Sequence, residues 1–488
     1  SVKSPQAAAM PATPDDEAGN TFGDGQDLAS LVLMAGDVRS GNYEEAQRLL
    51  NNLKAAPLKS FLEPVIDNWL NAGLGKPLSA STEGLSLLQA LHRGLAAEWA
   101  KQSETADAVF DALARVPLTP EGAMVVAAYN LRRGRIDQAR TALAEAIRQN
   151  PQDQDAKQML DSLDQGQTPA LKAEWSYHMQ GVTAGVGLAM RDLAHLMVAD
   201  EAWDSALIFG QLGRMVRADV PKLGLLIGTV FAQEKRLDDA KGVFESIPQG
   251  DPDYIEAQIQ LADLLDEQGK RDQAIETLEK LMQAGPEPRI AYALGELYRS
   301  AKDFEKAVRA YDQALELSGG HVDDELWSIY YVRAMAYDEL GEWQKSEDDL
   351  KTALTYRPDN PHVLNYLGYS YADRNQNLNE AKAMIIKALT QTPLDAYITD
   401  SLGWVYFREG DMVQASVLLE RAVSLKPYDP TINDHLGDLY AKTGRYLEAR
   451  YQWRRALDYA DKLRDADLIE AIKKKMEAGA PQDAKTAG

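Results

Sequence analysis

The chain has 488 residues, a formal net charge of −23 at pH 7 and no cysteine. The absence of cysteine excludes thiol catalysis, cysteine-based zinc sites and structural disulfides, and it suits a reducing and an oxidising compartment equally well. The excess of negative charge disfavours binding to nucleic acid or to anionic lipid, because both need basic patches. No stretch comes near eighteen consecutive apolar residues, so we expect no transmembrane helix.

The N-terminal end is rich in Pro, Ala, Gly and Asp, a composition that buries little apolar surface. It predicts a disordered leader over residues 1–26. Because the chain begins with Ser1 and not with Met, removal of a signal peptide upstream of Ser1 stays open. Residues 27–163 follow as an N-terminal helical array with a weak repeat. The pairs that mark this repeat are Ala46 with Leu50, Ala106 with Phe110, and Ala139 with Pro151.

Residues 164–181 interrupt the helical pattern. The turn-rich run from Asp164 to Pro169 breaks the periodicity, yet Ala127 and Ala194 lie 67 residues apart, which is two repeat lengths. We interpret this segment as an irregular joint between the N-terminal array and a C-terminal array. The alternative is a hairpin of unusual sequence that introduces no bend.

The C-terminal array, residues 182–477, carries a regular repeat. Gly368, Gly403 and Gly437 each follow a leucine and lie 35 and 34 residues apart. Two alanines follow each glycine at matched distances. These alanines are Ala381 and Ala388, Ala415 and Ala422, and Ala449 and Ala456. Residues 461–477 have an apolar stripe and predict a helix that caps the last repeat, and residues 478–488 predict a disordered tail.

A Leu-Gly, aromatic, Ala, Ala, Pro pattern with this period resembles the tetratricopeptide repeat (TPR). Two helices cross closely only where side chains are small, so Gly and Ala at fixed positions allow the crossing. The resemblance implies an all-α fold, a TPR solenoid of about 11–13 antiparallel helix hairpins arranged as a right-handed superhelix. The N-terminal array resembles only a generic TPR.

Residues that could carry catalysis are scattered along the chain. None of the six histidines has a metal-ligand spacing, and no phosphate-binding loop motif occurs. Gly185 and Gly187 stand in a helix-like stretch without a preceding strand, so they are no dinucleotide fingerprint. Acidic clusters at 323–325 and 347–349 lack the spacing of a calcium loop and indicate solvated helix faces. We therefore predict no enzyme, no cofactor and no metal site.

On the first helix of each hairpin, one face points away from the second helix, and by resemblance to TPR superhelices it lines a concave groove. Aromatic residues and carboxylates alternate there, which suits a protein or peptide segment with apolar and basic side chains. The alternative is that Tyr369, Trp404 and Phe407 pack against the adjacent hairpin. The predicted partner-binding residues are Tyr331, Tyr369, Tyr397, Asp400, Trp404, Phe407, Asp434 and Asp438.

Phrases within residues 182–460 resemble TPR proteins of the proteobacterial envelope, among them Asn365-Tyr366-Leu367-Gly368. Many of these proteins are exported or lipid-anchored, and some are adaptors for periplasmic proteases or for envelope assembly. The resemblance implies a non-catalytic adaptor or scaffold that is periplasmic or associated with the outer membrane. Because the chain has no cysteine, either a lipid-bearing cysteine lay upstream of Ser1 or this protein is not lipid-anchored. The alternative is a cytoplasmic or self-assembling TPR regulatory protein.

Overall fold

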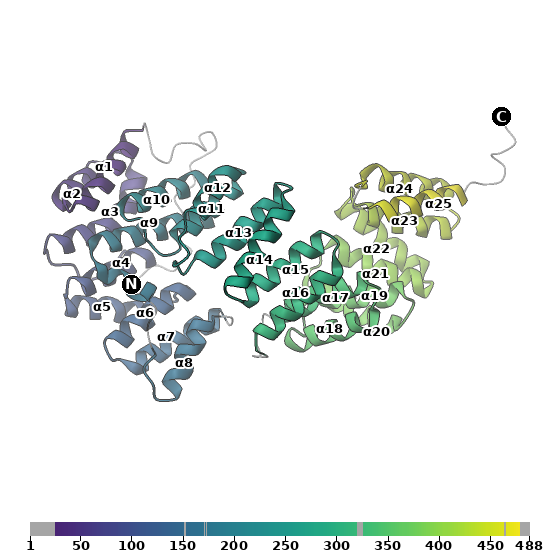
Figure 1. Cartoon of the computed structure of the whole chain (residues 1–488), viewed down its shortest axis with the longest axis horizontal. Helices are drawn as coiled ribbons and strands as arrows, with labels where there is room; N and C mark the ends of the chain where they lie inside the picture. Colours follow the sequence, from purple (N-terminus) through teal and green to yellow (C-terminus); the bar gives the residue numbers. More distant parts are fainter. Residues whose placement is uncertain are drawn as a thin grey trace. The chain divides into compact units, whose positions relative to one another are not determined.

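The computed structural model describes residues 25–150, 153–169, 171, 173–319, 326–462 and 465–478. Throughout these residues every regular element is a helix, and none is a β-strand (Figure 1). The predicted all-α fold is therefore confirmed. Apart from Gly25, Gln26 and Ala478, the predicted leader and tail lie outside the described residues.

The first of two compact units, unit 1, is Ser1–Pro286. A 3-10 helix, η2 (Ala173–Gln180), occupies much of the segment that the sequence predicts to be irregular. The α-helices of unit 1 are α1 (Gln26–Ser40), α2 (Tyr43–Asn51), α3 (Ala56–Gly73), α4 (Leu87–Trp99), α5 (Ser103–Leu113), α6 (Pro120–Arg132), α7 (Ile136–Gln149), α8 (Gln154–Asp164), α9 (Val182–Ala199), α10 (Trp203–Val216), α11 (Leu223–Gln233), α12 (Leu237–Glu245), α13 (Tyr254–Glu267) and α14 (Arg271–Ala284).

The second compact unit, unit 2, is Glu287–Gly488. Its last helix, α25, corresponds to the capping helix predicted over residues 461–477, and it buries Ile472 against the preceding hairpin. The helices of unit 2 are α15 (Pro288–Ser300), α16 (Phe304–Leu317), α17 (Leu326–Glu339), α18 (Trp343–Tyr356), α19 (Pro361–Asp373), α20 (Leu378–Gln391), α21 (Ala396–Glu409), α22 (Met412–Leu425), α23 (Pro430–Lys442), α24 (Tyr446–Tyr459) and α25 (Ala466–Ala478).

Consecutive helices pair into hairpins. Eleven such pairs occur within the described ranges, in agreement with the predicted repeat number. The helices α3, α8, η2 and α25 stand outside these pairs. The hairpins are α1/α2, α4/α5, α6/α7, α9/α10, α11/α12, α13/α14, α15/α16, α17/α18, α19/α20, α21/α22 and α23/α24.

The glycines of the repeat lie where the two helices of a hairpin cross. A Cβ added to Gly403 would lie 2.8 Å from Leu419 Cδ2, and one added to Gly437 would lie 2.5 Å from Trp453 Cδ1. Real Cβ atoms do not approach other atoms this closely, so only glycine fits the crossing. The six alanines of the last three repeats are fully buried. The predicted repeat register is therefore confirmed.

Unit 1 contains contacts between hairpins that are distant in sequence. Helices α9 and α10 pack against α1, and α9 also packs against α3 and α4. The contact with α3 is close, because a Cβ on Gly185 would lie 2.3 Å from the ring of Trp69. Helix η2 contacts α4, α6 and α9. The segment 164–181 and the helices on both sides of it thus belong to unit 1, and the two compact units divide after Pro286.

Helix α9 is, by length and composition, apolar enough to span a membrane, and no other helix of the described residues meets both conditions. Its position within unit 1 accounts for that composition. Leu193, Ala194 and Met197 are buried, Gly185 faces Trp69 of α3, and Gly187 faces Val220. We therefore interpret α9 as a core helix, whose apolar surface is covered by neighbouring helices.

Candidate functional site

The predicted partner-binding residues lie on the first helices of the last four hairpins, α17, α19, α21 and α23. Local sequence defines where α21 and α23 begin. The carboxylate of Asp395 accepts a hydrogen bond from Ile398 N at 2.9 Å, and Asp429 accepts from Ile432 N at 3.1 Å. An aspartate in this position stabilises the first turn of a helix. Pro430 occupies the first position of α23, where its missing N–H costs nothing.

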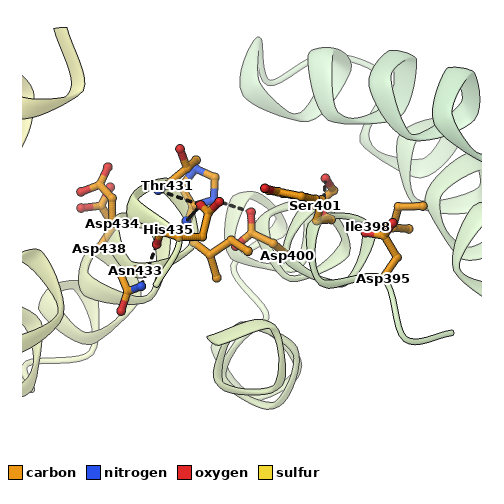
Figure 2. A network of polar contacts seen from close by, with 12 residues as sticks. Asp395, Ile398, Asp400, Ser401, Thr431, Asn433, Asp434, His435 and Asp438 are labelled. Carbon is orange, nitrogen blue, oxygen red and sulfur yellow. Dashed lines mark hydrogen bonds and ion pairs between the residues drawn. The ribbon is translucent and has the colours of Figure 1, made fainter. Parts of the chain in front are cut away.

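Four of the predicted residues gather around His435. Figure 2 shows the His435 ring on α23 reaching Asp400 on α21, and Nδ1 of His435 lies 2.7 Å from Asp400 Oδ2. The imidazole stacks on Trp404 with ring centroids 4.2 Å apart, and Trp404 stacks on Phe407 at 4.8 Å. The ring of Tyr369 lies 6.1 Å from His435. We call these five residues the histidine cluster.

Electrostatics favour a charged imidazole in the histidine cluster. Burial by itself lowers the pKa of His435, but Asp400, with Asp434 and Asp438 nearby, raises that pKa above its usual value. The solvent-exposed fraction of the residue surface is 4% for Asp400 and 7% for Trp404. The second carboxylate oxygen of Asp400 and the indole N–H of Trp404 have no hydrogen-bond partner in the part of the chain that the structure describes.

Asp434 and Asp438 form a second group, with Lys475 of α25. The ammonium of Lys475 lies 2.7 Å from a carboxylate oxygen of each aspartate, and Trp453 Nε1 donates to Asp438 at 3.1 Å. Burial lowers the pKa of Lys475, but the two aspartates raise it further, so the net shift is upward. Asp434 and Asp438, two of the three carboxylates of the predicted groove, therefore already pair with a cation from the same chain.

Tyr331 and Tyr397 lie apart from these two groups. Tyr331 is partly buried and contacts Tyr366 edge to face, with ring centroids 5.9 Å apart. Tyr397 is half exposed, and the ammonium of Lys426 sits 4.1 Å above its ring. The eight predicted residues thus form a cluster of four, a pair and two separate tyrosines.

Sequence reasoning missed one residue of each group. His435 is the centre of the histidine cluster, and Lys475 pairs with Asp434 and Asp438. His435 follows Asp400 by 35 residues, so it occupies nearly the same place one repeat later. That spacing was available as a signal. Lys475 lies on the predicted capping helix, but nothing in the repeat pattern indicates which carboxylates that helix approaches.

The burial of these side chains limits how a partner could use them. Asp400, Trp404 and Asp434 are each buried by more than nine-tenths, so a partner could contact them only after neighbouring hairpins separate. A basic segment would also have to displace Lys475 or compete with His435 for their carboxylates. As placed in this structure, these three residues contribute to packing between hairpins.

Exposed apolar side chains concentrate elsewhere on the same hairpins. Of the sixteen exposed large hydrophobic residues in the described ranges, eleven lie between Ile386 and Tyr459. Four of them form a set on the second helices, which we call the second-helix stripe: Val413 and Val417 of α22, and Leu447 and Tyr451 of α24. Another four lie at or near the ends of second helices, and we call them the end cluster: Leu394, Leu425, Tyr428 and Tyr459.

Both exposed sets follow the repeat. Val413 and Leu447 lie 34 residues apart, as do Val417 and Tyr451. The end cluster shows the same separation between Leu394 and Tyr428. Equivalent positions in two consecutive hairpins therefore expose apolar side chains to solvent.

The chain resembles known repeat proteins. Three family models described as tetratricopeptide repeat match residues 231–297, 288–321 and 331–381. TPR repeat-containing protein PA4667 of Pseudomonas aeruginosa is 29% identical over 191 residues, which cover 39% of this chain and 31% of that relative. This chain thus spans less than a third of the relative's length.

Solved structures of repeat proteins are also similar. A tetratricopeptide repeat protein from Parabacteroides merdae is 16% identical to this chain. The match covers 52% of this chain and 95% of that protein, with a TM-score of 0.43. PilW, described as a widely conserved type IV pilus biogenesis factor, is 22% identical to this chain. The match covers 39% of this chain and 85% of PilW, with a TM-score of 0.34.

The matched family models and the repeat-bearing relative agree with the glycine crossings and buried alanines of the hairpins. Residues 231–321 and 331–381 of this chain therefore contain tetratricopeptide repeats.

Proposed function

We propose that this protein is a non-catalytic scaffold that holds a protein partner on the last three hairpins of unit 2. The observation that carries the proposal is the concentration of exposed apolar residues between Ile386 and Tyr459. Contiguous exposed apolar surface is unfavourable in water and usually marks a site of interaction. TPR proteins bind protein or peptide partners, which agrees with such a surface.

A scaffold role also agrees with the residues around the histidine cluster. The His435 imidazole pairs with Asp400 and stacks on Trp404, and both of these residues are buried. No group of three or more His, Asp or Glu residues in the described ranges is arranged to hold a metal ion. Neither group of polar residues offers a nucleophile and a base facing an open site.

The concave groove predicted from the sequence stays a second candidate surface. Tyr397 is accessible, and Tyr331, Tyr369 and Phe407 are partly buried. A partner that used Asp400, Trp404, Asp434 or Asp438 would have to displace contacts that the chain makes with itself. The exposed apolar residues require no such change, and we therefore favour them.

We further propose a location in the bacterial envelope, periplasmic or associated with the outer membrane. The support is the sequence resemblance of residues 182–460 to envelope TPR proteins. Fractionation of cells that express the complete natural gene tests the location. Recovery in the periplasm or with outer membranes is expected, whereas recovery in the cytoplasm would favour the alternative of a cytoplasmic regulatory protein.

Copurification tests the scaffold function. The tagged complete protein, purified from its source cells, should retain a second polypeptide in a fixed ratio. Replacing Leu394, Tyr428, Leu447 and Tyr451 together with serine should reduce retention by at least about tenfold, the loss expected when interface anchors are removed. Circular dichroism and thermal unfolding serve as folding controls. The proposal fails if nothing is retained by the wild type, or if the folded variant retains the polypeptide equally well.

A further inference from the structure

The second-helix stripe departs from the rest of the array at matched positions. We number the residues of each second helix from its first residue, for the hairpins from α9/α10 onward. Position two is then the second residue of the helix, and position six lies about one turn after it. At position two, the earlier hairpins carry exposed polar residues: Asp204, Asp238, Asp272, Glu305, Gln344 and Asn379. The last two hairpins carry Val413 and Leu447, which are 73% and 86% exposed.

An acidic residue at this position has a physical reason. The first turn of a helix has unpaired N–H groups and a partial positive charge, so a carboxylate there is stabilising. Valine and leucine lack this interaction and expose apolar surface to water instead. At Val413 and Leu447 the chain therefore has residues that the isolated fold does not favour.

Position six is mixed in the earlier second helices, because α10, α12 and α20 carry Ile208, Gly242 and Ala383 there. The hairpins α13/α14, α15/α16 and α17/α18 carry Glu276, Arg309 and Asp348, all exposed. The last two hairpins carry Val417 and Tyr451, each 60% exposed. Positions two and six lie one turn apart on one face of a helix, opposite the buried Ala415 and Ala449. The substitutions thus create one apolar face on each of α22 and α24.

Charges of both signs lie beside this face. Glu420 of α22 and Asp458 of α24 share it by helical geometry, and they pair with Arg445 and Arg454. Arg450 lies on the same side of α24 as Leu447 by helical geometry, is exposed, and makes no ion pair with a described residue. The side chain of Arg454 is 72% exposed, and its nearest carboxylate, Asp458, is 3.9 Å away. Residues 412–459 contain seven Lys and Arg against six Asp and Glu, in a chain with a net charge of −23. Two of those six, Asp434 and Asp438, face Lys475.

We propose that the second-helix stripe docks an amphipathic protein segment whose apolar side chains are flanked by carboxylates. This inference rests on the proposed scaffold function and names the chemistry of the partner. An amphipathic helix presents apolar anchors at one-turn spacing, which corresponds to the spacing of positions two and six. Carboxylates beside those anchors would meet Arg450 and Arg454. A second copy of the chain and an anionic membrane are alternative occupants, and the experiments below distinguish them from the peptide segment.

Two synthetic peptides test the inference with the complete protein. Both are fluorescent amphipathic helices with the same leucine stripe, one with glutamates beside it and the other with lysines. Fluorescence anisotropy should show binding of the glutamate peptide at least about tenfold tighter than the lysine peptide. Leu447→Ser with Tyr451→Ser should weaken the glutamate peptide by about tenfold or more. The matched control is Glu305→Ser with Arg309→Ser, at the same positions of α16, which should leave binding unchanged.

A charge exchange gives the sharpest readout. Arg450→Glu with Arg454→Glu should weaken the glutamate peptide and strengthen the lysine peptide, which a loss of folding could not do. Equal binding of both peptides, binding of neither, or an unaffected stripe variant would overturn the inference. So would stripe-dependent binding to vesicles of anionic phospholipid, or stripe-dependent self-association in sedimentation. If a natural partner copurifies but remains bound to the stripe variant, the scaffold function stands and this inference fails.

Discussion

His435 is a buried imidazole whose surroundings favour its protonated form. Asp400 lies 2.7 Å from its Nδ1, Trp404 covers one face of the ring, and Asp434 and Asp438 add negative charge nearby. These carboxylates overcome the effect of burial and raise the pKa of His435. The ion pair therefore joins α21 to α23 through a side chain whose charge depends on pH.

Stability of unit 2 should depend on this proton. Because the pKa of His435 is higher in the folded chain, the protonated ring stabilises the fold below the usual histidine pKa of about 6.5. That contribution is lost as pH rises through the folded-state pKa. His435→Gln should remove this part of the pH dependence, as measured by chemical unfolding at a series of pH values above and below neutrality. Parallel curves for the wild type and the variant would contradict the assignment.

Trp404 separates the packing interpretation from the groove prediction. Its side chain belongs to the core of unit 2 and stacks on His435 and Phe407. Trp404→Ala should lower the free energy of unfolding of unit 2 by about 3–5 kcal/mol, the usual cost of removing a buried tryptophan. Trp404→Phe keeps an aromatic ring but removes the unpartnered N–H and part of the ring volume, so it should cost less than Trp404→Ala. A stable Trp404→Ala variant with weakened partner binding would instead support the groove.

The sequence predicts the place of a residue well where the repeat requires two helices of a hairpin to cross closely. Gly403 and Gly437 could be identified because any larger side chain meets Leu419 or Trp453. The charges of the groove face could not be paired from the pattern. Asp434 lies on a first helix, but its partner Lys475 comes from α25, and the spacing between them does not follow the repeat. Contacts across a repeat boundary depend on side-chain reach, which periodicity does not describe.

Helix α25 is attached to the last hairpin by an apolar side and by Lys475. Its apolar side covers the last hairpin through Ile472, with Leu468 and Met476 at the margin, and Lys475 adds the contacts to Asp434 and Asp438. Lys475→Met keeps the length of the side chain but leaves Asp434 buried without a cation. We expect a loss of about 1–3 kcal/mol, the cost of an unsatisfied buried polar group.

Hydrogen exchange locates this loss. Amides of α25 and α23 should exchange faster in Lys475→Met, while α15 and α16 should be unaffected. The neighbouring substitution Lys474→Met is a matched control, because Lys474 is exposed and pairs only with Glu470 on its own helix. Equal effects of the two substitutions would show that the Lys475 contacts do not hold α25.

On the scale of the whole molecule, unit 1 differs from an ordinary stack of hairpins. In a solenoid each repeat contacts only its neighbours, but α9 and α10 contact α1 although some 140 residues lie between α1 and α9. The sequence predicts the hairpins on both sides of 164–181, because they follow the local repeat. It does not predict that they pack together. Small residues such as Gly185 gave no indication that Trp69 was their partner.

The contact between α9 and α3 can be tested directly. Gly185→Leu would place a side chain into the ring of Trp69 and should destabilise unit 1 by about 1–3 kcal/mol or more, the usual cost of overpacking. Hydrogen exchange should increase in α1, α3 and α9. Gly36→Leu is the matched control, because an added Cβ at Gly36 of α1 meets no atom within 4 Å. Equal stability of the two variants would refute the close crossing.

The contacts that close unit 1 also determine the order in which it can fold during synthesis. Helices α1 and α3 leave the ribosome early, but the helices α9 and α10 that cover them are completed only when Val216 has been translated. Until then, the apolar side chains of α1 and α3 lack these partners, whereas hairpins α4/α5 and α6/α7 are already complete. Contacts between distant segments form slowly and leave intermediates exposed to aggregation. Helices α1 and α3 therefore reach their final packing later than the hairpins α4/α5 and α6/α7, which are made after them, and a nascent-chain chaperone would matter for these two helices.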